Sequence, residues 1–157
     1  MSKPTNAQPD SEAPIRTARS TVVVAAAVII EAGRVLTTQR PAGTHLAGLW
    51  EFPGGKLEPD EDPRDALVRE LREELGAEAA VGEILQVIFH RYREKSVLLL
   101  FYQASWLAGS EAPRPIGVQQ LAWRSAAELH NEEFAPADVS VLSKIRGLLG
   151  NQPMQPG

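Results

Sequence analysis

The chain of 157 residues contains no cysteine. It therefore forms no disulfide bonds and no thiolate metal centre, and nothing in it indicates an oxidising compartment. It also lacks an excess of positive charge, since its formal net charge at pH 7 is −4. Wrapping a nucleic-acid polymer calls for a basic face, so this class of partner is not expected. A small polyphosphate remains a compatible ligand, because bound cations offset the repulsion between acidic side chains and phosphate.

Long apolar runs and internal repeats are also missing, so we expect no membrane-spanning segment and no membrane partner. Residues 1–19 are rich in proline, serine, alanine and charge and lack apolar periodicity, which predicts a flexible tail rather than a secretory signal. Residues 151–157 predict a second short tail. Between them we expect one soluble, cytoplasmic domain over residues 20–150, whose sequence leaves monomer and homodimer open.

Apolar and β-branched runs predict the strands of an α/β fold. The expected strands are 21–30, 35–40, 49–52, 81–90, 97–106 and 121–123, and the expected helices are 63–75, a brief one at 125–128, and 136–149 with Val139, Leu142, Ile145 and Leu149 on one side. The run at 21–30 is continuous enough for a strand buried on both faces, with 35–40 as its hairpin partner. Helices before and after the strands predict a mixed sheet covered on both faces, an α/β/α sandwich.

The helix at 63–75 has clear boundary signals. Asp62 can cap its N-terminus, Pro63 suits its first turn and Gly76 can terminate it. Leucines at 67, 71 and 75 form an apolar stripe that predicts attachment to a core.

Beside that stripe, Glu70, Glu73 and Glu74 occupy offsets of three and four residues and share one face of the helix. Like charges so placed repel by roughly 0.2–0.5 kcal/mol per pair. A charged surface helix is the simpler interpretation of such a cluster taken alone. Carboxylates presented from a rigid support also suit Mg²⁺ or Mn²⁺, and the flanking residues favour this second interpretation.

Those flanks complete a longer pattern. Gly54 and Gly55 precede the helix, Glu61 follows Gly55 by six residues, and Arg69-Glu70-Leu71-x-Glu73-Glu74-x-Gly76 follows. This resembles the Nudix box, G-x5-E-x7-R-E-U-x-E-E-x-G-U with U apolar, and Leu71 and Ala77 fill the two U positions. From residue 21 to 149 the order of elements is similar to the MutT branch of the Nudix hydrolases, which implies a Nudix-type α/β/α sandwich.

The resemblance implies a Mg²⁺-dependent enzyme, with Mn²⁺ as a possible substitute. MutT-like members remove oxidised dGTP from the nucleotide pool, so the implied reaction is hydrolysis of 8-oxo-dGTP to 8-oxo-dGMP and pyrophosphate. The implied catalytic and metal-binding groups are the carboxylates of Glu70, Glu73 and Glu74 and the carbonyl of Gly54. Glu70 is the preferred acceptor of the proton of the attacking water. Glu61 is expected to pair with Arg69 in a structural role.

The substrate-binding residues are likewise implied by position. Arg40 is expected to contact the phosphates and His45 to lie in a loop of the nucleotide pocket. Tyr92 is expected to pack on the base, and Asp138 to hydrogen-bond the edge of the base. The residues expected around the nucleotide are Glu51, Phe52, Pro53 and Gly54. For several of them a structural role is an alternative: Asp138 also suits the first turn of a helix, and Tyr92 also suits an exposed hairpin tip.

One departure from the MutT pattern concerns the loop before Trp123, where a glutamate is common. The expected acid falls on Gly117, and the nearest upstream carboxylate, Glu111, is out of register.

Two alternatives to the implied function remain. One is a Nudix hydrolase for CTP, a modified pyrimidine nucleotide or ADP-ribose, because the box recognises only phosphate and metal. The other is a nucleotide-binding module of low activity.

Overall fold

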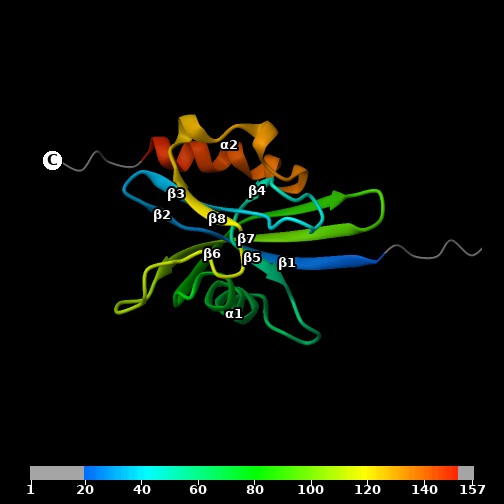
Figure 1. Ribbon diagram of the computed structural model, residues 1–157, viewed down its shortest axis with the longest axis horizontal. Helices are drawn as coiled ribbons and strands as arrows, with labels where there is room; N and C mark the ends of the chain where they lie inside the picture. The colour runs from blue at the N-terminus through cyan, green and yellow to red at the C-terminus, as the bar shows by residue number, and fades with distance from the viewer. Residues whose placement is uncertain (1–19, 152–157) are drawn as a thin grey trace, which may run out of the picture.

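Two four-stranded sheets lie between two helices in the computed structural model, which describes residues 20–151 (Figure 1). The first sheet has the order β5 (Gly54–Lys56), β1 (Thr21–Val28), β7 (Ser96–Trp106), β6 (Ala79–Arg91). The second contains β2 (Ile30–Glu31), β3 (Arg34–Gln39), β4 (Trp50–Glu51) and β8 (Gln120–Arg124), which pairs with β3. Helix α2 (Pro136–Gly150) lies above the sheets in Figure 1 and α1 (Pro63–Leu75) below them. The predicted α/β/α sandwich is confirmed.

Helix α1 forms as its sequence predicts. The Asp62 carboxylate accepts a hydrogen bond from the Arg64 amide at 2.8 Å, and Gly76 ends the helix in the left-handed region with φ 66°. Leu67, Leu71 and Leu75 are fully buried between α1 and the first sheet. Burial of this stripe fixes the rotation of the helix, and therefore which acidic side chains point toward the sheet edge.

The expected strand at 21–30 is interrupted at Ile29, and its predicted hairpin is wrong over most of its length. Only β2 pairs with β3, whereas β1 pairs in parallel with β7 and antiparallel with β5. The second half of β1 is buried as expected, but Val22 and Val24 are only partly covered because they line a cavity. Parallel pairing joins segments far apart in the chain, so an apolar run alone does not reveal it.

Helix α2 closes the other side with Val141, Leu142, Ile145 and Leu149 in the core. Val139, expected on the apolar side, is only half-buried, and Asp138 is buried in its place. The brief helix predicted at 125–128 is a 3₁₀ turn, η1 (Ala126–Glu128), and a second turn, η2 (Asn131–Glu133), follows it. Neither α-helix of residues 20–151 is long and apolar enough to cross a membrane. Except for Asn151, the two predicted tails lie outside the described residues.

Candidate active site

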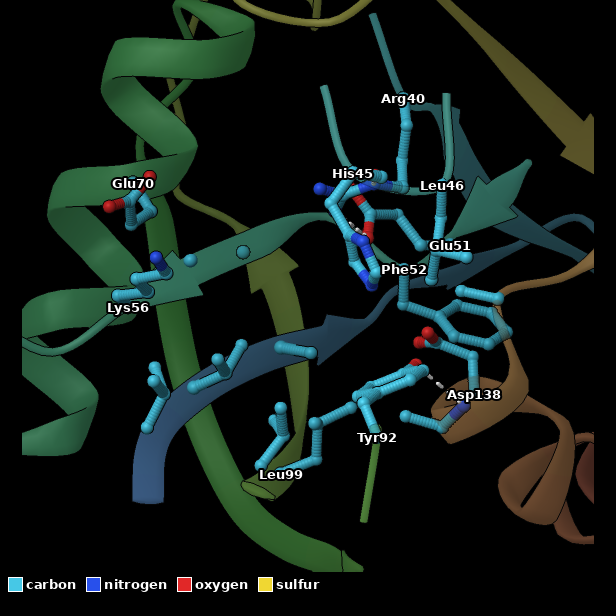
Figure 2. Close-up of a pocket in the computed structure, with 18 of the residues that line it drawn as sticks. Arg40, His45, Leu46, Glu51, Phe52, Lys56, Glu70, Tyr92, Leu99 and Asp138 are labelled. Atoms are coloured by element: carbon cyan, nitrogen blue, oxygen red, sulfur yellow. Dashed lines mark hydrogen bonds and ion pairs between the residues drawn. The ribbon is translucent and has the colours of Figure 1, made fainter. Parts of the chain in front are cut away.

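A cavity of about 340 Å³ opens between α1, the first sheet and the start of α2 (Figure 2). Three groups of elements line it. The strand β5 and helix α1 contribute Gly54, Gly55, Lys56, Glu70 and Glu74, and the strands β1 and β7 contribute Val22, Val24, Ala26, Val97 and Leu99. The segment from the end of β3 through β4, the hairpin after β6 and the start of α2 contribute Arg40, His45, Leu46, Glu51, Phe52, Tyr92, Lys95, Ala135, Ala137 and Asp138. Figure 2 shows Glu70 and Lys56 on one side and Arg40, Glu51 and Asp138 on the other. The cavity therefore has an acidic end and a mixed polar end, joined by an apolar floor.

The acidic end is built by α1. Glu70 and Glu74, one turn apart, line the cavity, and the side chain of Glu70 is only 16% exposed. Glu73 does not line the cavity, and its side chain is 59% exposed. Arg69 Nη1 donates to Glu70 at 2.9 Å and to Glu73 at 3.3 Å. The same guanidinium donates twice to Glu61, at 2.9 Å each, which confirms the expected structural pairing.

The carboxyl of Glu74 lies in an environment that disfavours its negative charge. Burial, together with the nearby charges of Glu70 and Glu51, raises its pKa from 4.5 to about 8, against a backbone hydrogen bond from Gly54 that lowers it. A divalent cation among these carboxylates would offset their mutual repulsion.

The donor set fits a magnesium site that the substrate completes. Within residues 20–151, no three acidic or histidine side chains are gathered closely enough to hold a metal alone. Magnesium, however, usually binds through one or two carboxylates together with substrate phosphates and water. Glu70 and Glu74 supply such a pair, and Gly54, the proposed carbonyl ligand, lies beside them.

Gly55 leaves no room for a side chain against Glu70. A Cβ placed there would lie 2.3–2.6 Å from the Glu70 carboxyl atoms. We expect Gly55→Ala to displace this carboxylate. If Glu70 has the role that the box implies, Mg²⁺-dependent activity should fall by roughly 10²-fold, since small displacements of catalytic groups have effects of that size. A magnesium titration of turnover, with a thermal melt for folding, measures the effect. Gly147→Ala in α2, where a Cβ meets nothing within 4 Å, is the matched control. An unchanged titration for Gly55→Ala would contradict this packing.

At the polar end, Arg40 organises the loop that follows β3. Its Nη1 donates to the Glu51 carboxylate at 2.9 Å and its Nε to the His45 carbonyl at 2.6 Å. Leu46 in this loop has φ 58°, a left-handed conformation that leucine rarely adopts. The structure thus brings Arg40 and His45 to the cavity. Contact of Arg40 with phosphate remains a prediction, and the observed contacts are structural.

Asp138 is the most enclosed polar group of this end, with 4% exposure. Burial first, and then the charge of Glu51, raises its pKa well above the ordinary range; a backbone hydrogen bond from Phe52 and the charge of Arg40 oppose this. The Tyr92 hydroxyl accepts a hydrogen bond from the Ala137 amide at 3.1 Å (Figure 2).

Of the predicted site residues, two lie outside the cavity. Glu73 is turned to solvent and Arg69, and the carbonyl of Pro53 accepts a hydrogen bond from the Ala27 amide at 2.8 Å in the sheet. Two lysines at the cavity, Lys56 and Lys95, were not anticipated. Lys56 directly follows Gly54 and Gly55, so its place at the cavity could have been predicted from the sequence. Lys95 lies in a hairpin turn, where no sequence pattern predicts a place at the cavity.

Gly117, where an acid was expected, packs against the C-terminal end of α1. Its amide and that of Ile116 donate to the Glu74 carbonyl at 3.0 Å. A Cβ on Gly117 would lie 3.2 Å from Glu74 Cα, so the loop and the helix are in close contact. Glu111 is exposed and does not line the cavity. The carboxylates at the cavity are therefore those of Glu51, Glu70, Glu74 and Asp138.

Comparison with known proteins decides the family. Residues 25–144 match the NUDIX domain. The chain belongs to the Nudix family. It is a Nudix hydrolase of the MutT-like kind, so the resemblance drawn from the sequence is confirmed.

Named relatives of this Nudix hydrolase differ in substrate. It is 44% identical over 133 residues to the CTP pyrophosphohydrolase of Escherichia coli K12, covering 84% of this chain and 96% of the relative. It is 32% identical over 120 residues to the 8-oxo-dGTP diphosphatase of the same strain, covering 75% and 90%. The solution structure of the E. coli ORF135 protein aligns with a TM-score of 0.70 at 38% identity, covering 87% of this chain and 96% of that one.

Proposed function

We propose that this Nudix hydrolase is a Mg²⁺-dependent pyrophosphohydrolase that converts nucleoside triphosphates to monophosphates and pyrophosphate. The observation that supports it is one cavity with two acidic carboxyls of the box at one end and a buried carboxyl, Asp138, at the other. A nucleotide has the same two parts, a polyphosphate that requires cations and a base that requires directional hydrogen bonds.

The phosphate end would hold magnesium through Glu70 and Glu74. Bound magnesium neutralises charge on the phosphates and lowers the pKa of a coordinated water. Glu70 would accept the proton of the attacking water, because it lines the cavity and is oriented by Arg69. Lys56, next to Glu70 in Figure 2, adds a positive charge at this end. No acid from the loop around Gly117 is required for this assignment.

The base end favours a base that presents a hydrogen-bond donor beside an acceptor. Burial favours the neutral acid of Asp138, which offers one O–H donor and one C=O acceptor. Cytosine presents its N4 amino group beside N3, and 8-oxoguanine presents N7–H beside O6. Guanine presents two acceptors, N7 and O6, on its N7 edge, but it presents N1–H beside O6 on its other edge. The neutral acid therefore distinguishes guanine from 8-oxoguanine only when the N7 edge is the one that faces Asp138. The charges of Glu51 and Arg40 act on Asp138 in opposite directions, the first raising and the second lowering its pKa, so its protonation depends on both.

These considerations support CTP as the leading substrate and 8-oxo-dGTP as the second. The resemblance to the MutT branch placed 8-oxo-dGTP first. The relative that matches over 96% of its length at 44% identity is named for CTP, whereas the E. coli relative named for 8-oxo-dGTP is 32% identical. Sanitation of oxidised purine nucleotides, and with it a contribution to DNA repair, thus becomes the second candidate function.

A nucleotide panel tests the proposal. We expect pyrophosphate release from CTP and 8-oxo-dGTP with kcat/KM at least about tenfold above that for dGTP, because a purine read at its N7 edge leaves the O–H or the C=O of the acid unpaired unless N7 carries a hydrogen. Release should vanish when EDTA removes magnesium. Equal rates for dGTP and CTP would contradict the base assignment, preference for ADP-ribose would contradict the substrate class, and tight binding without turnover would favour the binding module.

A further inference from the structure

Helix α2 begins without a cap of its own. Its N-cap residue, Ala135, is extended (φ −56°, ψ 137°) and has no side-chain acceptor. Pro136 follows and has no amide hydrogen. The first amide hydrogens of a helix have no partner within it, and serine, threonine or aspartate normally supplies one. Of the next two amides, that of Asp138 donates to the Ala135 carbonyl at 2.8 Å.

The other amide, that of Ala137, is satisfied from a distant part of the chain. It donates to the Tyr92 hydroxyl at 3.1 Å, across 45 residues of sequence. The ring of Tyr92 also meets the rings of His45, at 5.4 Å between centroids, and of His90, at 4.4 Å, both edge to face. One side chain thus joins the loop after β3, the strand β6 and the first turn of α2.

We propose that Tyr92 is a positioning residue for base recognition, whose hydroxyl serves as the missing N-cap of α2 and thereby holds Asp138 at the base end. The effect of this cap on base recognition rests on the proposed function, whereas the hydrogen bond itself is present without substrate. This role uses the hydroxyl of Tyr92, whereas the packing on the base implied by the family resemblance needs only the aromatic ring.

Asp138 depends on this cap because it is the next residue of the same turn. It is almost completely buried, and its carboxyl meets the backbone of Phe52 on one side. If the first turn of α2 loosens, the acid has a route to solvent and loses its fixed orientation toward the cavity. The ring contacts of Tyr92 with His45 and His90 remain when only the hydroxyl is removed, so Tyr92→Phe tests the hydroxyl and leaves the ring in place.

The first experiment uses the full chain without nucleotide or metal. In Tyr92→Phe, the amide of Ala137 should exchange with solvent about fivefold faster, the effect of losing a typical N-cap. Adding Ala135→Ser supplies a local acceptor at the N-cap position and should restore slow exchange. Tyr102→Phe, the same change at the other tyrosine, should leave this amide as in the wild type. Unchanged exchange in Tyr92→Phe would overturn the cap.

The second experiment measures kinetics with CTP and dGTP in the presence of magnesium. Tyr92→Phe should raise KM for CTP about fivefold, leave kcat within about twofold and narrow the preference for CTP over dGTP. The double variant should regain the preference. If exchange is rescued and the preference is not, the hydroxyl contacts the nucleotide itself and the positioning role is overturned. If no variant, wild type included, turns over any nucleotide, the proposed function fails, while the exchange result still decides the cap.

Discussion

Replacing Glu70 or Glu74 with glutamine is expected to lower nucleotide hydrolysis by roughly 10²–10⁴-fold, the range for removal of a general base or a metal-orienting group. Glutamine preserves the shape of the side chain but removes the charge that, in the proposed mechanism, holds magnesium and accepts a proton. Glu73→Gln should cost less, because that side chain is exposed and outside the cavity. Glu83→Gln, on the exposed side of β6, is the matched control. Steady-state pyrophosphate release at saturating magnesium measures the hydrolysis rate of the wild type and of each variant.

Thermal melts of the metal-free protein distinguish a lost catalytic group from a damaged fold. Because the pKa of Glu74 is about 8 in the folded protein and 4.5 in the unfolded chain, the folded state binds the extra proton between these values. Its contribution to the free energy of unfolding is therefore full below pH 4.5 and is lost as pH rises to 8. The glutamine of Glu74→Gln does not ionise, so the variant does not lose this stability as pH rises. Its melting temperature should therefore be higher than that of the wild type at pH 8 and equal to it at pH 4.5.

Added magnesium should then stabilise the wild type more than Glu74→Gln, since binding to the folded state alone raises its stability. A variant that keeps wild-type turnover would remove that residue from the site. Identical melting curves at pH 8 without metal would mean that the Glu74 carboxyl is solvated, contrary to its burial and to its interaction with the charges of Glu70 and Glu51.

The parts that sequence predicted well depend on local signals. Helix α1 has its cap, proline and terminal glycine within a single segment, and the box is contiguous. The rotation of α1 was less predictable. Offsets of three and four place Glu70, Glu73 and Glu74 on one face, but a helix face is wide. Burial of the leucine stripe turns Glu70 and Glu74 into the cavity and leaves Glu73 at its outer border with Arg69.

The remaining features depend on contacts between distant segments. The parallel pairing of β1 with β7 uses two apolar runs that would suit other neighbours equally well. The cap of α2 by Tyr92 has no sequence signal, because the acceptor lies on a different hairpin. The base-reading role proposed for Asp138 comes from family resemblance, and only the structure shows that the group is buried and interacts with the charge of Glu51.

The protonation of Asp138 leads to the second large effect. If the neutral acid pairs with the base, Asp138→Asn should preserve recognition of CTP, because its amide also offers a donor beside an acceptor. Asp138→Leu offers neither and should lower kcat/KM for CTP by roughly 10²-fold or more. It also removes the acceptor of a backbone hydrogen bond from Phe52, so a melt is needed alongside, with a cost of about 1–3 kcal/mol expected.

The pH dependence separates a neutral acid from a carboxylate. Since the pKa of Asp138 is raised, kcat/KM for CTP in the wild type should fall as pH rises through that pKa, because the O–H donor is lost. The amide of Asp138→Asn cannot lose its donor, so kcat/KM of this variant should not fall as pH rises through the pKa of Asp138. Any change of kcat/KM with pH that is caused by Glu70 or Glu74 should remain. Activity of the wild type that instead rises over the same range, with Asp138→Asn inactive, would show that an ionised carboxylate reads the base. The preferred base would then be one with two adjacent donors, such as the N1 and N2 edge of guanine.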